Sequence, residues 1–205
     1  MDDQQKDLFV RLRERYSSGD IPWDDPSPPP EVIDFVPSLS PGRALDLGCG
    51  YGRATIYLAS LGWEVDGIDF IPEAVSVAAN RAMAQKVAAR FHIASITDLD
   101  FLSGPYDFAL DVGCSHNLDE NSLRIYRSHL ARLIKPGGFF LLFARLRPKN
   151  SVKDEQDFHG LDLDQITGLY SSSFELDWHR LGETVIDLDT SWPSGWFRFK
   201  AVPEE

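Results

Sequence analysis

The sequence predicts an α/β protein built on a doubly wound, seven-stranded, mostly parallel sheet in a three-layer αβα sandwich. From Arg43 onward, short apolar runs alternate with helical patterns, and this βαβα order is typical of a parallel sheet with helices on both faces. The most apolar run, FFLLFAR at residues 139–145, has the composition of a central parallel strand. Two alternating runs near the end of the chain, on either side of a turn expected at SWPSG (residues 191–195), predict a closing antiparallel β-hairpin.

Each further element has a local reason in the sequence. Apolar residues recur at helical spacing within residues 2–16, which predicts an amphipathic first helix. Five prolines within residues 21–30 exclude helix and central strand, so a loop is expected there before a short helix at 31–39. The other expected strands are residues 43–47, 64–70, 90–95 and 106–112, and the other expected helices are residues 51–61, 72–86, 119–134 and 162–172.

Size, charge and cysteine content limit the possible functions. The 205 residues suit one domain, because no repeat or low-complexity break divides the chain. The net charge of −12 would repel nucleic acid and anionic membranes, and no Lys/Arg stripe offsets it. Cys49 and Cys114 have no neighbours at zinc spacing, so no metal is expected. We expect a small-molecule substrate; the sequence leaves the oligomeric state open.

The same features predict a cytoplasmic location. No apolar run approaches the ~20 residues that cross a bilayer. The N-terminal stretch, MDDQQKDLFVRLRERY, is charged and lacks the apolar centre of a signal peptide.

The stretch RALDLGCGYGRATIYLASL, residues 43–61, combines a strand, a glycine loop and a helix. This geometry lets backbone N–H groups and a helix N-terminus approach a nucleotide-like ligand closely. A dinucleotide fingerprint needs glycine at the first, third and sixth loop positions. Counted from Gly48 the sixth position is Arg53, and counted from Gly50 it is Thr55, so both counts fail. The loop also lacks the Lys of a triphosphate-binding loop.

A second signal is Asp69, which ends the next expected strand some 20 residues downstream. A carboxylate at that position can accept both ribose hydroxyls of a nucleoside. Alone it would be as well explained as a turn residue, but its spacing from the glycine loop favours a ribose ligand.

At these residues the chain resembles a known family, the class I S-adenosylmethionine-dependent methyltransferases. The matching segments, in order, are DLGCGYG, GIDF, ASITDLDF, YDFALDVGCSHNL and LIKPGGFFLLF, and they cover residues 40–145. The proline-rich segment IPWDDPSPPPEVIDFV is similar to the small-molecule branch, which includes thiopurine, thiol and tellurite methyltransferases. The resemblance implies a Rossmann-like domain over residues 1–205, with an N-terminal helix and lid (1–40), a cofactor-binding core (41–145) and a substrate loop with the hairpin (146–205).

The resemblance also implies S-adenosylmethionine as cofactor and S-adenosylhomocysteine as product. The implied contacts are Asp46, Gly48, Gly50 and Gly52 around the methionine end, Asp69 on the ribose, Phe70 on the adenine face, Ile96, Thr97 and Asp98 at the adenine edge, and Asp111 and Val112 near the amino group and the methyl. Trp23 is the best candidate for a lid over the cofactor, although anchoring the N-terminal segment explains it equally well.

The charge pattern favours the same cofactor independently. S-adenosylmethionine carries a sulfonium cation and no phosphate, so a loop without Lys suits it. Four acids, Asp46, Asp69, Asp98 and Asp111, fall at or just beyond expected strand ends, where open α/β sheets bind ligands. A negative site favours a cationic cofactor.

Methyl transfer from a sulfonium is an in-line displacement that depends mainly on positioning. The candidate catalytic residues are Asp111 and His116, the latter as a general base. A soft nucleophile such as a thiol would not need that base. The alternative explanation for His116 is that its ring packs against its neighbours or caps the next helix. Some further side chains fall in segments that would surround a substrate, where packing is the more common explanation: Tyr16, Arg145, His159, Trp192 and Trp196. The rival functions are a non-catalytic S-adenosylmethionine-binding protein and, less favoured by the glycine count, an NAD-dependent oxidoreductase.

Overall fold

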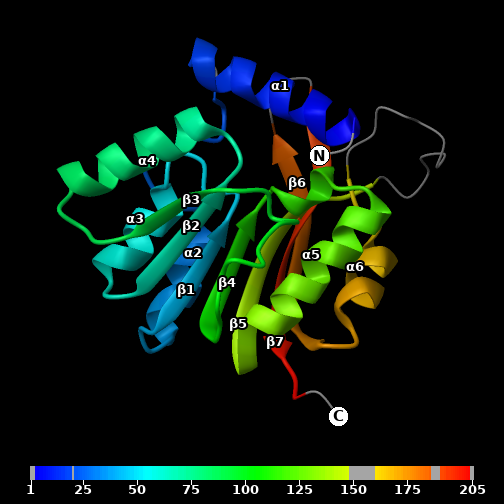
Figure 1. The fold of residues 1–205 in the computed structure, drawn as a ribbon. Coiled ribbons are helices and arrows are strands. Elements are labelled where there is room, and N and C mark those ends of the chain that lie inside the picture. The colour runs from blue at the N-terminus through cyan, green and yellow to red at the C-terminus, as the bar shows by residue number, and fades with distance from the viewer. Residues whose placement is uncertain (1–2, 20, 148–159, 186–189, 204–205) are drawn as a thin grey trace. The chain divides into compact units, whose positions relative to one another are not determined.

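The computed structural model describes residues 3–19, 21–147, 160–185 and 190–203, and its chain divides into two compact units, residues 1–102 and 103–205. Each unit carries its own strands and the helices that cover them (Figure 1). His159, one of the residues expected near a substrate, lies outside the described residues.

The first unit is a parallel three-stranded sheet, in the order β3-β2-β1, with the glycine loop at the end of β1. Apolar runs form the strands, and four of the five residues of β1 are buried. Pro72 begins α4, as its fixed φ allows at a first helical turn. The elements are α1 (Asp3–Ser18), α2 (Pro30–Phe35), a 3₁₀ turn (Val36–Ser38), β1 (Arg43–Leu47), α3 (Arg53–Ser60), β2 (Glu64–Asp69), α4 (Pro72–Ala84) and β3 (Arg90–Ile93).

The second unit is a mixed four-stranded sheet in the order β4-β5-β7-β6. Strands β4 and β5 are parallel, whereas β7 is antiparallel to both β5 and β6. In Figure 1 helices α5 and α6 lie together beside these strands. The elements are β4 (Tyr106–Val112), a 3₁₀ turn (Ser115–Asn117), α5 (Glu120–Leu133), β5 (Ile134–Arg145), α6 (Leu163–Tyr170), β6 (Phe174–Val185) and β7 (Ser191–Ala201).

Aromatic side chains form the core of the second unit. The Phe140 ring of β5 lies 5.4 Å from the Tyr170 ring of α6, which lies 4.9 Å from the Phe199 ring of β7. All three side chains are fully buried. This core occupies one face of β5 and β7, because alternate residues of a strand point to opposite faces, and so leaves the other face for different side chains.

The predicted fold class is confirmed: seven strands form a mixed sheet with flanking helices and an antiparallel C-terminal pair. The strands expected at 43–47 and 106–112 are found with those bounds.

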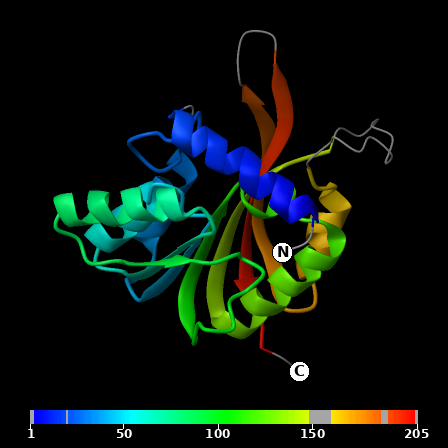
Figure 2. The ribbon, with the colours of Figure 1, turned by 45° about the horizontal axis from the view of Figure 1, so that its top comes forward.

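The prediction of a turn at SWPSG is wrong. These residues begin β7 and pair with β6 from Val185↔Ser191 to Leu181↔Gly195. Strand β7 is therefore longer than expected, and Figure 2 shows β6 and β7 projecting together. Proline is tolerated within this strand for a geometric reason. The carbonyl of Pro193 accepts from Leu146 N–H at 2.7 Å, so its missing N–H points to the side where β5 has already ended at Arg145.

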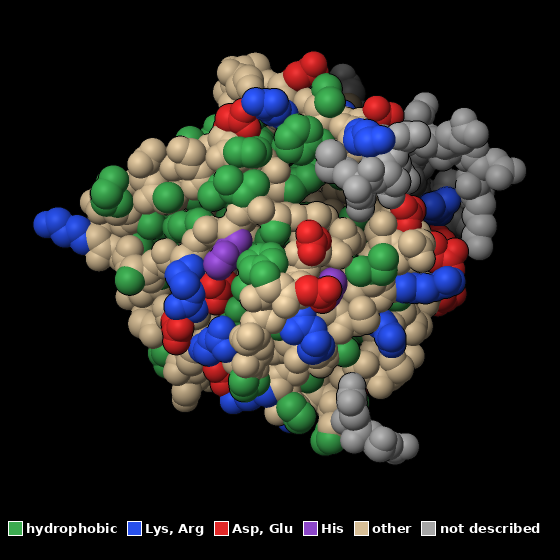
Figure 3. All heavy atoms as spheres, viewed as in Figure 1, with side chains coloured by type: hydrophobic (Ala, Val, Ile, Leu, Met, Phe, Trp, Pro, Cys, Tyr) green, Lys and Arg blue, Asp and Glu red, His purple; other side chains and the backbone are tan. Residues whose placement is uncertain are grey.

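The surface and the helix lengths bear on the expected partners. In Figure 3, acidic and basic side chains lie interspersed on the face shown, between patches of hydrophobic ones. Among the residues that the structure describes, no helix combines the length and the apolar character needed to cross a membrane.

Candidate functional site

The glycine loop between β1 and α3 requires glycine for its backbone and for its space. Gly48, Gly50 and Gly52 have φ angles of 74°, 53° and 80°, in the left-handed region that side chains rarely adopt. A Cβ on Gly50 would lie 3.0 Å from the Tyr16 hydroxyl oxygen, and one on Gly52 would lie 3.0 Å from Ala78 Cβ. Glycine at every second position therefore has two causes: the backbone conformation would strain any other residue, and there is little space for a side chain at Gly50 and Gly52.

Asp69 joins the end of β2 to this loop. One carboxylate oxygen accepts from Gly50 N–H at 2.9 Å and the other accepts from Ile71 N–H at 2.9 Å. The side chain is buried, and burial raises its pKa, against the opposing effect of the hydrogen bonds from Ile71 and Gly50. Each carboxylate oxygen has a second lone pair, so the geometry leaves acceptor capacity for a ligand.

Asp46 supports the loop from below. Its buried carboxylate accepts from the Thr55 hydroxyl at 2.6 Å and so ties β1 to the first turns of α3. The Cys49 thiol is also buried beside the loop.

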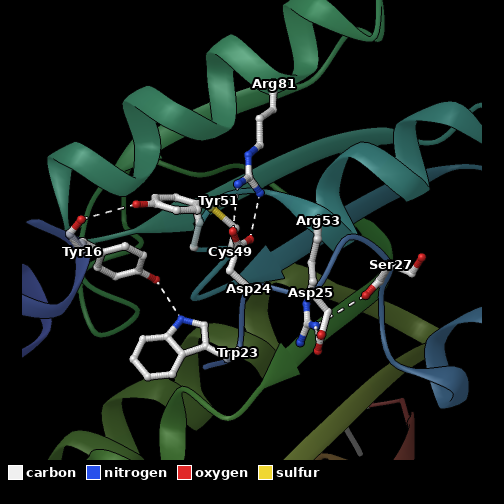
Figure 4. Close-up of polar contacts among 10 residues, drawn as sticks. Tyr16, Trp23, Asp24, Asp25, Ser27, Cys49, Tyr51, Arg53 and Arg81 are labelled. Atoms are coloured by element: carbon white, nitrogen blue, oxygen red, sulfur yellow. Dashed lines mark hydrogen bonds and ion pairs between the residues drawn. The ribbon is translucent and has the colours of Figure 1, made fainter. Parts of the chain in front are cut away.

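In the N-terminal segment, Tyr16 lies beside Tyr51 of the glycine loop and Trp23 lies beside Tyr16, as Figure 4 shows. Trp23 donates its indole N–H to the Tyr16 hydroxyl at 3.2 Å, and the Tyr16 ring lies 5.1 Å from the Tyr51 ring of the loop. Arg81 of α4 binds the Asp24 carboxylate with two 2.8 Å hydrogen bonds and places its guanidinium 4.7 Å from the Tyr51 ring centroid. Trp23 is therefore fixed through Tyr16 and still 39% exposed.

The predicted adenine contacts occupy the ends of β2 and β3. Phe70 packs edge-on against Phe9 of α1 at 5.6 Å. After β3, the Ser95 hydroxyl bonds that of Thr97 at 2.8 Å and the Ser95 carbonyl accepts from Asp98 N–H at 2.9 Å. Ile96 is buried, whereas Asp98 is exposed.

In the second unit, Asp111 holds the turn that follows β4. Its fully buried carboxylate accepts from Cys114 N–H at 2.8 Å, Ser115 N–H at 3.1 Å and the Tyr126 hydroxyl at 2.9 Å. Burial raises the pKa of Asp111. Val112, beside it, is only partly buried. The three donors direct the Asp111 oxygens toward the turn and α5.

His116 lies in that turn, and its tautomer is determined by a neighbour. The backbone N–H of Arg145 lies 3.2 Å from His116 Nδ1 and can only donate, so Nδ1 accepts. In the neutral ring the proton is then on Nε2, which makes Nε2 a donor.

Two contacts that local sequence spacing could not predict join β5 to β7. The Arg145 guanidinium lies 4.4 Å from the Trp192 ring centroid, and the Phe143 ring lies 5.0 Å from the Trp196 ring. Segments 50 residues apart meet here only through strand pairing. Sequence spacing also did not predict the Asp24–Arg81 and Asp111–Tyr126 pairs, because the partners of each pair lie on different elements.

Residues 44–138 match the model of the family described as "Methyltransferase domain". This segment belongs to that family. The resemblance predicted from the motifs is thereby confirmed for the segment that carries the glycine loop, Asp69 and His116.

Individual relatives match parts of the chain around this methyltransferase domain. An uncharacterized methyltransferase of Synechocystis is 36% identical over 55% of this chain and 52% of its own length. The ubiquinone biosynthesis O-methyltransferase of Xanthomonas oryzae is 32% identical over 66% of this chain and 58% of its own length. The chain thus spans little more than half the length of these two curated relatives.

A solved structure shares the fold over nearly the whole chain. The 1,6-didemethyltoxoflavin-N1-methyltransferase of Burkholderia thailandensis, solved with 1,6-didemethyltoxoflavin and S-adenosylhomocysteine, covers 96% of this chain and 88% of its own, with a TM-score of 0.76 and 21% identity. At that identity the likeness establishes the fold around the methyltransferase domain.

Proposed function

We propose that the protein is an S-adenosylmethionine-dependent methyltransferase that acts on a small molecule. One observation carries this proposal: three left-handed glycines form the loop after β1, and Gly50 donates its N–H to the buried carboxylate at the end of β2. That arrangement lets the peptide backbone approach a ligand closely, with a carboxylate beside it that can accept ribose hydroxyls. The methyltransferase family match over residues 44–138 supports it.

The residues of the first unit fit this cofactor. The glycine loop has no Lys to clamp a phosphate, and carboxylates suit a sulfonium cation. Asp69 would accept the ribose hydroxyls with its remaining lone pairs, while Asp46, bonded to Thr55, would hold the loop around the methionine end. Asp98, exposed beside buried Ile96, would accept from the adenine amino group. The other proposed contacts are Gly48, Gly52, Phe70, Thr97, Val112 and Trp23.

When bound, S-adenosylmethionine supplies an activated methyl group with a good leaving group. The protein's part is to place a nucleophile about 3 Å away and in line, and such positioning contributes about 7–11 kcal/mol. We assign Asp111 to this positioning, because its carboxylate fixes the 113–117 turn through Cys114 and Ser115 N–H groups. His116 would present its Nε2–H to the acceptor, which is a donor's role in place of the expected general base.

Calorimetry and thermal unfolding with S-adenosylmethionine, S-adenosylhomocysteine and NAD test the cofactor. A ligand at about 100 times its Kd stabilises the native state by about 2.7 kcal/mol, or roughly 5–10 °C at this chain length. We expect that shift with the first two ligands. A shift with NAD alone would overturn the proposal.

Activity needs a separate measurement. Transfer of labelled methyl from S-adenosylmethionine to thiols, phenols, amines or carboxylates would show catalysis. Binding without transfer to any acceptor would instead identify a non-catalytic S-adenosylmethionine-binding protein.

A further inference from the structure

Strand register collects a set of aromatic and cationic side chains on one face of the C-terminal strands. Phe143 pairs with Trp196 and Arg145 pairs with Ser194 across β5 and β7. Directly paired residues point to the same face, and Trp192, two residues from Ser194, points there too. This face lies opposite the aromatic core that packs under α5 and α6. We call Arg145, Trp192, Trp196, Phe143 and His116 the β5–β7 cluster.

The cation of this cluster is oriented by an aromatic ring. The Arg145 guanidinium lies 4.4 Å from the Trp192 ring centroid, within cation–π distance. Arg145 is half-buried, and this burial lowers the pKa of a guanidinium that stays charged at any physiological pH. A partly desolvated, oriented guanidinium is the group best suited to bind a carboxylate with two parallel hydrogen bonds.

A second donor in the cluster needs an acceptor. The Trp192 indole nitrogen is buried, and among the described residues no acceptor lies within hydrogen-bonding distance of it. Buried N–H groups without a partner are rare in native proteins and call for an explanation such as a ligand oxygen. Trp192 thus carries both the ring that orients Arg145 and a second N–H that lacks an acceptor.

His116 supplies a third donor, and a hydrogen bond from the Arg145 backbone determines which ring nitrogen carries the proton. The Arg145 backbone N–H occupies His116 Nδ1, so the neutral imidazole carries its proton on Nε2. The Phe143 and Trp196 rings, 5.0 Å apart and tilted by 45°, place aromatic carbon beside these groups, with Phe143 the more exposed of the two. The cluster therefore combines donors, one positive charge and aromatic surface.

We propose that the β5–β7 cluster binds the methyl acceptor, and that this acceptor is a small aromatic molecule bearing a carboxylate. The carboxylate binds Arg145 and the Trp192 N–H, and the ring packs on Phe143 and Trp196. His116 Nε2–H orients the acceptor's second polar group. This inference rests on the proposed methyltransferase function and names the acceptor's class.

Matched acceptor pairs test the charge requirement. Labelled methyl transfer from S-adenosylmethionine is measured for 2-mercaptobenzoate against thiophenol, and for 4-hydroxybenzoate against phenol. Each pair differs only in the carboxylate. Losing a charge-assisted, bidentate contact typically costs about tenfold or more, so we expect the acid of a methylated pair to have a kcat/KM at least about tenfold higher. Equal kcat/KM for the acid and its neutral partner would overturn the inference.

Two variants and a control locate the effect. Arg145→Gln should lower the acid's kcat/KM far more than that of thiophenol and so remove the preference for the acid, and Arg145→Lys should restore part of it. Trp192→Phe keeps an aromatic ring and removes the indole N–H, so it should lower the acid's kcat/KM by about three- to tenfold relative to that of the neutral acceptor. Arg124→Gln removes an exposed arginine of α5 and should change neither. Equal losses for acid and neutral acceptor in Arg145→Gln would contradict a role in carboxylate recognition.

A binding assay separates this inference from the function on which it rests. Calorimetry of the two acids with the protein saturated in S-adenosylhomocysteine detects the site even if neither acid is methylated. Failure of S-adenosylhomocysteine to bind would refute the proposed function. S-adenosylhomocysteine binding combined with no binding of either acid would refute the β5–β7 cluster as a carboxylate site.

Discussion

Asp69 and Asp111 both end parallel strands and both are buried, yet their hydrogen bonds give them different capacities. Asp69 accepts from the Gly50 N–H on one oxygen and from the Ile71 N–H on the other, and the Phe70 N–H also interacts with the carboxylate. Asp111 accepts from two backbone N–H groups and from the Tyr126 hydroxyl. Burial raises the pKa of both carboxyls, but Asp111 uses its oxygens on the turn and on α5, whereas Asp69 bonds the glycine loop, where a ligand would bind.

Asp69→Asn should weaken S-adenosylmethionine binding by about 10–100-fold, since a hydrogen bond to a charged acceptor contributes about 1.5–3 kcal/mol. The raised pKa of Asp69 sets the sign of a pH effect: the acceptor is lost as pH falls, starting above the range of an ordinary aspartate. Calorimetry from pH 7.5 to 5 should show affinity falling in the wild type relative to Asp69→Asn. Parallel profiles would exclude Asp69 as the ligand.

Tyr126→Phe should destabilise the fold by about 1–3 kcal/mol, because it removes a donor from the fully buried Asp111 carboxylate. The matched control is Tyr57→Phe, a partly exposed tyrosine of α3, with an expected change below about 0.5 kcal/mol. Urea unfolding measures both. Equal stabilities for the two variants would show that the Tyr126 hydroxyl contributes nothing.

At the scale of elements, the N-terminal segment is fastened to α4 at two points. Arg13 of α1 bonds Glu73 in the first turn of α4 at 2.7 Å, and Asp24 of the loop bonds Arg81 further along that helix. Phe9, earlier in α1, packs on Phe70, which lies just before α4. These contacts place the Tyr16 hydroxyl next to Gly50, so the segment is part of the glycine loop's surroundings.

Asp24→Asn should loosen this segment and weaken S-adenosylmethionine binding about fivefold, because a partly exposed ion pair contributes on the order of 1 kcal/mol. Asp25→Asn is the adjacent control: its carboxylate bonds Arg53 at 3.2 Å but is 72% exposed. Limited proteolysis and calorimetry compare the two. If Asp25→Asn has the larger effect, the Asp24–Arg81 pair does not fasten the segment.

Gly52→Ala should destabilise the loop by more than Gly62→Ala, although both glycines have positive φ angles, 80° and 89°. The strain of a left-handed alanine costs about 1–2 kcal/mol at either site. A Cβ at position 52 would also meet Ala78 at 3.0 Å and Phe91 at 3.2 Å, whereas one at position 62 meets nothing within 4 Å. Urea unfolding isolates this crowding as the difference between the variants, and no difference would show that α4 and β3 yield freely.

At the scale of the whole molecule, the chain divides into two compact units, residues 1–102 and 103–205. The sequence predicts that both belong to a single domain. If they fold as one domain, β1 and β5 should open with the same free energy, because neither unit would be stable without the other. Hydrogen exchange under mild urea measures both strands. Different opening free energies that persist with saturating S-adenosylhomocysteine would identify independent folding units.

Much of the fold was predictable because its signals are local. The buried strand at 43–47, the left-handed glycines and the proline that starts α4 depend on residues within a few positions of one another. The turn at SWPSG was mispredicted because proline and glycine favour turns locally, whereas here β5 ends beside Pro193 and leaves the pairing with β6 intact.

The sequence by itself determined the methyltransferase domain, the glycine loop and the carboxylate at the end of β2, since φ angles, strand burial and spacing are encoded in adjacent residues. Only the tertiary structure decided which lone pairs remain for a ligand. It bonded Asp111 to Tyr126, placed the Arg145 N–H on His116 Nδ1 and set the Arg145 guanidinium over Trp192. Hydrogen-bond partners and tautomers depend on strand register and helix packing between distant segments, and no local pattern records them.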